Sequence, residues 1–240
     1  MSNIQIICDT MNDVPKEIVE KYNIEILPAT IVFDGIEYKA GVDIEGDEFY
    51  KMLRSSNSMP TTSQVTYATF KDTFEKYLDE GKKILYLSGS SAASGTYQSA
   101  MIAKNDIESD DIHIFDTYSL CIGGGMLITE AAIMAQESND IDYIINKLNE
   151  YKEKVEVYFS VDSLDYLHKG GRISGTKATI GTILNIKPIL KILVFVVFAT
   201  GSAVSSAESN HGEVVYSGKV YVPEVFTFLR AILVTLTSNP

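Results

Sequence analysis

The chain has 240 residues and a formal net charge of −12, with 45% hydrophobic and 22% charged residues. This composition is typical of a globular protein with a substantial core, and the length suits one large domain or two modest ones. The acidic balance, with only three arginines, excludes a large nucleic-acid footprint and disfavours attraction to an anionic membrane surface. A small buried ligand remains compatible with these properties.

The two cysteines and the most apolar run indicate the cellular context. Cys8 and Cys121 lie far apart and form no C-x-x-C pair, so we expect both to be reduced packing residues. No basic segment followed by an apolar one opens the chain, so we expect no signal peptide. The run at 189–199 is shorter than the about 20 residues that cross a bilayer. We therefore predict a cytoplasmic protein without stable membrane insertion.

The first part of the chain alternates between strand-like and helix-like runs. Residues 4–8 read as a buried strand, and a loop and a short helix follow, with Asp13 as a candidate cap and Pro15 in the first turn. Residues 25–33 form a second β-rich run, and residues 43–56 carry a further helix. The predicted order is strand, helix, strand, helix.

The middle of the chain continues this alternation. Residues 66–80 carry the apolar stripe of an amphipathic helix that ends at Gly81. Nearly continuous apolar strands alternating with helices predict a doubly wound α/β domain with a mainly parallel sheet, covering residues 1–153. The later strand candidates are 83–87, 112–116 and 155–161, and the later helix candidates are 94–104, 123–136 and 140–152.

The pattern changes after residue 162, where a helix, a Gly-rich turn and another helix lead toward a proline. We interpret this as the opening of a second α/β domain, which gives domains of residues 1–153 and 154–240. Farther on, residues 212–222 have two β-prone arms around Ser217-Gly218, which is typical of a hairpin.

The segment "SGSSAASGTYQSA", residues 88–100, is dense in hydroxyls and glycines and directly follows a predicted strand. Ligands of parallel α/β sheets bind beyond the carboxyl ends of the strands. A helix beginning near Ser94 would place a hydroxyl and free N–H groups at its positive end, which suits a carboxylate or a phosphate. The alternative is that Ser94 only caps its helix and the other serines fill a polar loop.

Two further segments could contribute to an anion site. "MPTTSQ" (59–64) contains Thr61, Thr62 and Ser63, which would otherwise serve as a cap or turn before the helix at 66–80. "HKGGRISG" (168–175) contains Arg172, which could neutralise an anion or be a surface residue beside a helix-terminal glycine.

Asp9 and Thr10 follow the first predicted strand, at the same edge of the sheet as Ser94. A carboxylate there could assist catalysis or hold a metal, or it could cap the next helix or tie down the loop. The chain has no P-loop, no G-x-S-x-G elbow and no histidine pair of zinc-binding spacing. It has the parts of an anion-binding site without a complete catalytic apparatus.

Six segments, taken in chain order, form a specific combination. They are "CDTMNDVP", "YKAGVDIEGDEFYKML", "MPTTSQ", "LSGSSAASGTYQSA", "VDSLDYLHKGGRISG" and "IGTILNIKPIL". Together they resemble the DegV family of bacterial fatty-acid-binding proteins, over about residues 3–190. The resemblance implies a two-domain α/β protein that encloses a long-chain fatty acid between its domains. Carried over by motif, the ligand-binding residues are Thr62, Ser63, Ser94, Gly95 and Arg172.

The resemblance also implies how such a protein works. The family's partner is the ATP-binding subunit of fatty acid kinase, which phosphorylates the bound acyl carboxylate, so this chain would need no cofactor, no metal and no catalytic residue of its own. The alternative is an α/β enzyme that acts on a small phosphorylated metabolite at the same Ser/Thr-Gly edge, with Asp9 or His168 as acid or base.

The tail after residue 190 departs from the family pattern. Family members usually continue with a stretch rich in Arg and Lys and a later His near the head group, whereas residues 189–240 contain only six charged residues. We therefore expect an atypical tail and leave His211 out of the site.

Overall fold

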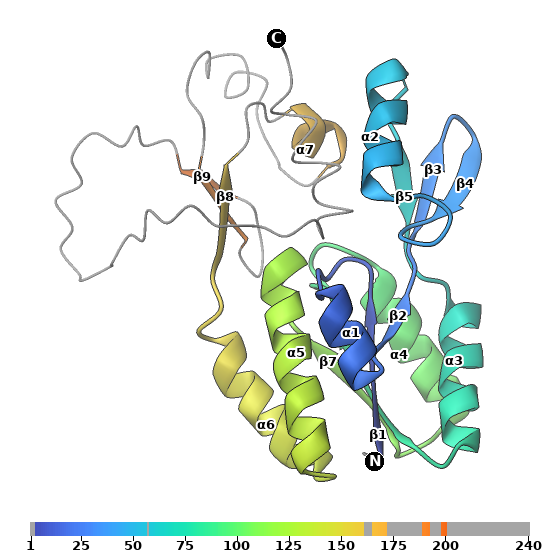
Figure 1. Cartoon of the computed structure of the whole chain (residues 1–240), viewed down its shortest axis with the longest axis vertical. Helices are drawn as coiled ribbons and strands as arrows, with labels where there is room; N and C mark the ends of the chain where they lie inside the picture. The colour runs from blue at the N-terminus through green and yellow to red at the C-terminus, as the bar shows by residue number, and fades with distance from the viewer. Residues whose placement is uncertain (1–2, 57, 161–164, 172–188, 193–197, 201–240) are drawn as a thin grey trace, which may run out of the picture.

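The computed structural model describes residues 3–56, 58–160, 165–171, 189–192 and 198–200. In this part of the chain the strands form one four-stranded sheet and two three-stranded sheets (Figure 1). The helices are α1 (Lys16–Tyr22), α2 (Gly46–Ser55), α3 (Tyr67–Asp79), α4 (Thr96–Ile107), α5 (Cys121–Glu137), α6 (Ile141–Lys152) and α7 (Asp165–Lys169).

The four-stranded sheet is fully parallel, which confirms the predicted α/β class. Its strands run in the order β2 (Glu25–Leu27), β1 (Ile4–Asp9), β6 (Lys83–Ser88) and β7 (Ile112–Asp116). Their carboxyl ends therefore meet at one edge, where an α/β protein binds its ligands.

Helices cover both faces of the parallel sheet. On β1, Ile4 and Ile6 pack into a core shared with α5 and α6, whereas Ile7 packs into a core shared with α3 and α4. Successive side chains of a strand point to opposite faces, so a sheet buried on both sides favours nearly continuous apolar runs, and the buried polar residues Gln5 and Asp9 of β1 are hydrogen-bonded exceptions. Each fully buried Ile or Leu contributes about 1.5–3 kcal/mol relative to an exposed one.

A second, antiparallel sheet lies beyond the carboxyl edge of the parallel one (Figure 1). It consists of β4 (Ile36–Lys39), β3 (Thr30–Phe33) and β5 (Thr61–Ser63), in that order. With α2 it encloses a small core of its own, of Ile31, Phe33, Ala40, Ile44, Phe49, Tyr50 and Leu53.

The β-rich run predicted over residues 25–33 is confirmed as β structure, but it forms two strands instead of the one strand of the predicted order. The run divides into β2, in the parallel sheet, and β3, in the antiparallel one. Pro28 lies at the division, and because proline has no N–H to donate to a ladder, the chain leaves the first sheet there.

The strand expected at 155–161 exists but does not join the parallel sheet. It is β8 (Val157–Ser160), which pairs antiparallel with β9 (Ile189–Ile192), and β9 pairs in turn with β10 (Phe198–Thr200). The side chains of β8 alternate between half-buried and exposed, unlike the strands of the parallel sheet. The second helix expected after the Gly-rich turn and the hairpin at 212–222 lie outside the described residues.

The structure confirms some of the local predictions and corrects one of them. Gly81 follows α3 with φ of +72°, as expected for a residue that ends a helix in the left-handed region. Asp13 does not cap α1, which begins after Pro15 without a side-chain cap. Cys8 and Cys121 are both buried and free, as expected. No helix in the described part of the chain is long and apolar enough to span a membrane.

Candidate functional site

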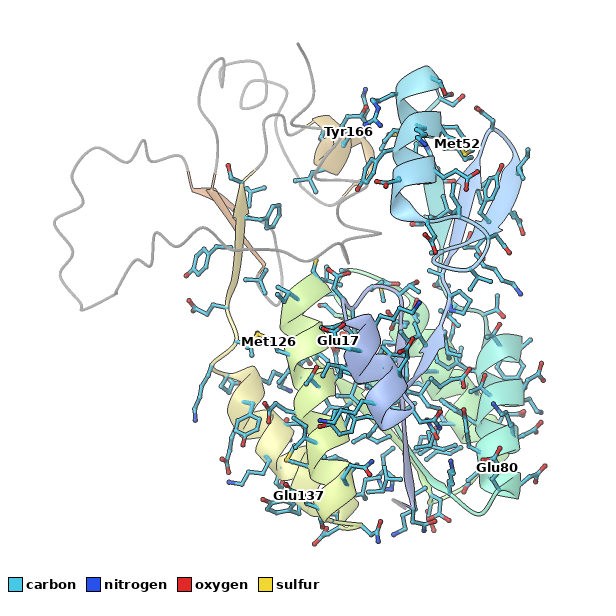
Figure 2. All side chains as sticks on the ribbon, viewed as in Figure 1. Glu17, Met52, Glu80, Met126, Glu137 and Tyr166 are labelled. Carbon is cyan, nitrogen blue, oxygen red and sulfur yellow. The ribbon has the colours of Figure 1, made fainter. Side chains whose placement is uncertain are left out.

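The candidate site lies where the carboxyl end of β6 leads into α4. Backbone hydrogen bonds hold the intervening loop: the N–H of Ser90 donates to the carbonyl of Ser119 at 2.9 Å, and that of Thr117 to the carbonyl of Ser88 at 3.2 Å. The loops after β6 and β7 are thus bonded to each other. Figure 2 shows Glu80 and Glu137, near the ends of α3 and α5, at the opposite end of the parallel sheet from this site.

Ser94 lies two residues before Thr96, the first residue of α4. The N-cap is Gly95, one residue later than expected, and the Oγ of Ser94 accepts the N–H of Thr96 at 3.2 Å. Its own N–H donates to the carbonyl of Ser90 at 3.2 Å. Ser94 therefore satisfies the first helical N–H, as the capping alternative predicted, and its side chain remains half-buried.

The fold brings the "MPTTSQ" segment against the start of α4. The Nε2 of Gln64 donates to the Oγ of Ser99 at 2.8 Å, and the N–H of Val65 donates to the Oγ1 of Thr96 at 3.3 Å. These bonds join residues more than 30 positions apart in sequence. Gln64 and Val65, which directly follow β5, thus join the first hydroxyl segment to the start of α4, and this junction is called the hydroxyl edge below.

Gly95 is explained by this close approach. Its φ of −73° is open to any residue, so the backbone conformation does not require glycine. A Cβ at this position would collide with the Oε1 of Gln64. A larger residue at this position would require the exposed Gln64 side chain to move aside and give up its hydrogen bond to Ser99.

Thr62 and Ser63 belong to β5, an exposed edge strand. Ser63 pairs with Thr30 of β3 and Thr62 with Ile31. The alternative that this segment caps α3 is wrong, because the cap is Thr66, whose side chain accepts the N–H of Thr69 at 3.2 Å. The hydroxyls of Thr62 and Ser63 are thus not used as a helix cap.

Asp9 and Thr10 tie down loops. Asp9 is fully buried and accepts hydrogen bonds from the hydroxyl of Tyr86 at 2.6 Å, the N–H of Met11 at 2.8 Å and the N–H of Gly89 at 3.2 Å. Burial raises the pKa of Asp9, and these three hydrogen bonds act in the opposite direction. The Oγ1 of Thr10 accepts the N–H of Ala29 at 2.9 Å. Asp9 therefore holds the ends of β1 and β6 together instead of facing a substrate.

Asp13 is a second buried acid near this edge. Its N–H donates to the carbonyl of Cys121 at 3.0 Å, and a Cβ at Gly125 would collide with its backbone carbonyl, so the loop is packed against α5. Its Oδ2 is buried and finds no hydrogen-bond partner among the described residues. Burial raises the pKa of Asp13 from its ordinary value of 3.8 to about 7.

The remaining sequence candidates lie apart from this edge or outside the described residues. Arg172 is outside them, directly after Gly171, which has φ of +72°. His168 is exposed on α7, the helix that carries Tyr166 in Figure 2. His113 lies in β7, where burial lowers its pKa. No group of three or more His, Cys, Asp or Glu in the described part of the chain could hold a metal ion.

Sequence reasoning missed three side chains of this edge, Gln64, Thr96 and Ser99. Gln64 follows the two predicted hydroxyls, and Thr96 follows Ser94-Gly95, so both stand beside predicted site residues. Their pairing across the fold depends on how β5 meets α4, which one sequence does not reveal. As a whole, the edge can present neutral hydroxyl donors and a helix N-terminus to an anion.

Parallel topology and a hydroxyl-lined carboxyl edge define a protein of the α/β class with an anion-compatible site. A model described as an uncharacterised protein of the DegV family matches residues 3–201. The chain belongs to the DegV family, as its motifs predicted. Residues 202–240, most of the segment expected to be atypical, lie outside that match.

Named relatives and solved structures agree with this assignment. A DegV domain-containing protein of Caldanaerobacter subterraneus subsp. tengcongensis is 40% identical over 190 residues, which are 79% of this chain and 68% of that protein. A DegV family protein of Thermus thermophilus, described for its fatty acid binding, has a TM-score of 0.75 at 28% identity, over 84% of this chain and 71% of the other. DegV of Bacillus subtilis, described as a fatty acid binding protein, has a TM-score of 0.72 at 32% identity, over 82% and 70%.

Proposed function

We propose that this chain binds a long-chain fatty acid and holds its carboxylate at the edge formed by β5 and the start of α4. The observation that carries the proposal is the pair of bonds from Gln64 to Ser99 and from Val65 to Thr96, which join the two hydroxyl segments. The fatty acid binding described for the Thermus thermophilus and Bacillus subtilis proteins supports the same ligand class.

The chemistry of the edge suits a carboxylate. Moving a carboxylate out of water is costly unless donors replace the lost hydration. Hydroxyls at Thr62, Ser63 and Ser94, with the N-terminus of α4 beyond Gly95, supply neutral donors and a favourable dipole. A site of this kind can hold the head group while the acyl chain stays in an apolar environment.

The finer organisation follows from the family motifs and is part of the proposal. Arg172 would approach the carboxylate as a charged donor. The chain would divide into domains of residues 1–153 and 154–240, with the acyl chain between them.

We further propose that the protein is a cytoplasmic carrier and not itself an enzyme. It would present the bound carboxylate to the ATP-binding subunit of a fatty acid kinase, which would form the acyl phosphate. The bound fatty acid would be its ligand, and it would need no cofactor and no metal. The role of Asp9 agrees with this division of labour, because the carboxylate that could have assisted catalysis is fully buried and already accepts hydrogen bonds from Tyr86, Met11 and Gly89.

Titration of delipidated protein with palmitate tests the proposal, using Ser94→Ala and Thr62→Val. We expect each variant to bind palmitate at least about tenfold more weakly, because a hydrogen bond to a charged group contributes about 1.5–3 kcal/mol. Ser109→Ala is a matched control, because the Oγ of Ser109 also accepts the N–H two residues on, at 3.2 Å, but beyond the far end of α4. It should bind like the wild type. Wild-type protein that binds no palmitate would refute the proposal.

A further inference from the structure

Thr96 lies two positions after Ser94 and has a buried hydroxyl. Its hydrogen bonds affect which groups of a ligand Ser94 can bind. Its side chain is 1% exposed. Its Oγ1 accepts the N–H of Val65 at 3.3 Å and lies 3.0 Å from the Oγ of Ser94. The hydroxyl of Thr96 therefore connects Val65, the residue that follows the "MPTTSQ" segment, to the predicted ligand-binding serine.

The direction of this connection follows from the donors and acceptors. A backbone N–H can only donate, so Thr96 must accept from Val65. The 3.0 Å contact between the Oγ of Ser94 and the Oγ1 of Thr96 can form with either oxygen as the donor. Because buried hydroxyl protons in proteins are hydrogen-bonded, and this contact is the one that the described residues offer to the Thr96 proton, we assign the Thr96 hydroxyl as the donor.

Ser94 is left with one function toward a ligand. Its Oγ accepts from the hydroxyl of Thr96 at 3.0 Å and from the N–H of Thr96 at 3.2 Å. A serine oxygen accepts through two lone pairs, so both are engaged. What remains for the ligand is the Ser94 proton, on a half-buried side chain.

Resting on the proposed function, we propose that Thr96 is a positioning residue that makes Ser94 a dedicated hydrogen-bond donor, so that the site selects an acceptor-only head group. The ionised carboxylate of a fatty acid is such a group. A fatty alcohol carries its own proton, which would face a serine that can no longer accept it. The chain of bonds from Val65 through Thr96 to Ser94 therefore discriminates an acid from an alcohol of the same length.

Gln64 lies next to the start of this series of hydrogen bonds. Its amide holds Ser99 at 2.8 Å and fills the space beside Gly95, so Val65, the next residue, is kept in reach of Thr96. The bonds at Ser99 and Thr96 both lie near the start of α4, so the residues that follow β5 contact this helix at two points.

The test compares binding of palmitate and hexadecanol to delipidated full-length protein at pH 8, where the acid is ionised. The variants are Thr96→Val, which keeps the shape and removes the hydroxyl, and Thr96→Ser, which keeps the hydroxyl. Thr73→Val is the matched control, because it removes a hydroxyl that bonds a backbone carbonyl at 2.7 Å within α3. Circular dichroism establishes that each variant is folded, and Thr96→Ala replaces Thr96→Val if the latter does not fold.

We expect wild-type protein to bind palmitate at least about tenfold more tightly than hexadecanol. Thr96→Val should lower palmitate affinity about tenfold and change hexadecanol affinity less than about twofold, because the released Ser94 can turn to accept. Thr96→Ser and Thr73→Val should bind palmitate within about twofold of the wild type. These ratios together support the proposal.

Three results would overturn it while leaving the proposed function intact. One is wild-type affinity for palmitate in Thr96→Val, another is an equal loss of both ligands in that variant, and the third is a failure of Thr96→Ser to retain palmitate. Wild-type protein that binds neither ligand would instead refute the proposed function, and the role of Thr96 would fall with it.

Discussion

The parallel sheet and the hydroxyl edge are built by different forces. The sheet is buried on both faces, and apolar side chains from β1, β6 and β7 hold α1 and α3 to α6 against it. The edge is held by hydrogen bonds among Gln64, Ser99, Val65, Thr96 and Ser94. Hydrophobic burial is non-directional, whereas hydrogen bonds fix donors and acceptors at defined positions. We therefore expect changes in the sheet to alter stability and changes at the edge to alter ligand binding.

The largest expected effect is in the sheet region. Phe70 of α3 is fully buried, with its ring 4.8 Å from that of Tyr86 and 5.5 Å from that of Phe74. Phe70→Ala should lower the free energy of unfolding by about 3–5 kcal/mol, because it removes the buried ring and leaves a cavity. Urea unfolding measures this, and a loss below about 1 kcal/mol would show that α3 does not depend on this core.

Between the two regions, Asp13 should make stability depend on pH. Its folded pKa of about 7 lies above the ordinary 3.8, so between about pH 4 and pH 7 the folded state keeps a proton that the unfolded state loses. Stability from this group is thus complete below about pH 4 and is lost as the pH rises to about 7. The free energy of unfolding of Asp13→Asn, relative to that of the wild type, should therefore be about 2–4 kcal/mol higher at pH 8 than at pH 4.

Urea unfolding of both proteins at the two pH values checks this prediction. Asp9, whose pKa burial also raises, is present in both proteins, so its contribution cancels. Asp110→Asn, at an exposed site, is the control and should follow the wild type. A constant difference between Asp13→Asn and the wild type at all pH values would contradict the assignment.

A smaller effect is expected where Gly95 meets Gln64. Gly95→Ala should cost about 0.5–1.5 kcal/mol of stability, because the new methyl group displaces the exposed Gln64 side chain and breaks its hydrogen bond to Ser99. In a Gln64→Ala background the space is open, and the same change should cost markedly less. A double-mutant cycle in urea isolates this coupling, since any effect of alanine at the N-cap is common to both backgrounds. Equal costs in the two backgrounds would exclude the contact.

The smallest effect is expected on the outer surface. Met126 of α5 is 56% exposed and labelled in Figure 2. Met126→Gln should change the free energy of unfolding by less than about 0.5 kcal/mol, because little apolar surface is lost from a packed environment. A loss comparable to that of Phe70→Ala would show that this face is packed against another part of the protein.

Much of the fold could be predicted from the sequence because hydrophobic periodicity is local. The apolar runs of β1, β6 and β7 and the stripe of α3 marked elements that the structure confirms. Pairing partners were less predictable: β3 and β8 read as strands but belong to other sheets. The residues of a strand predict that it is extended, but its pairing partner depends on the rest of the chain.

The same distinction holds at the candidate site. Capping logic found Ser94, because a serine before a helix has a local signature. The contributions of Gln64 and Thr96 depend on contacts between segments 31–35 residues apart, which no local pattern encodes. The family motifs identified the segments, and the structure identified the bonds between them.

The central claim is that the hydroxyl edge holds a fatty-acid carboxylate, and native mass spectrometry of protein purified without delipidation tests it most directly. Wild-type protein and Ser109→Ala should carry an added mass that dissociates as a long-chain fatty acid, and Ser94→Ala should carry much less. Wild-type protein that repeatedly carries no such mass and takes up none from added palmitate would contradict the claim.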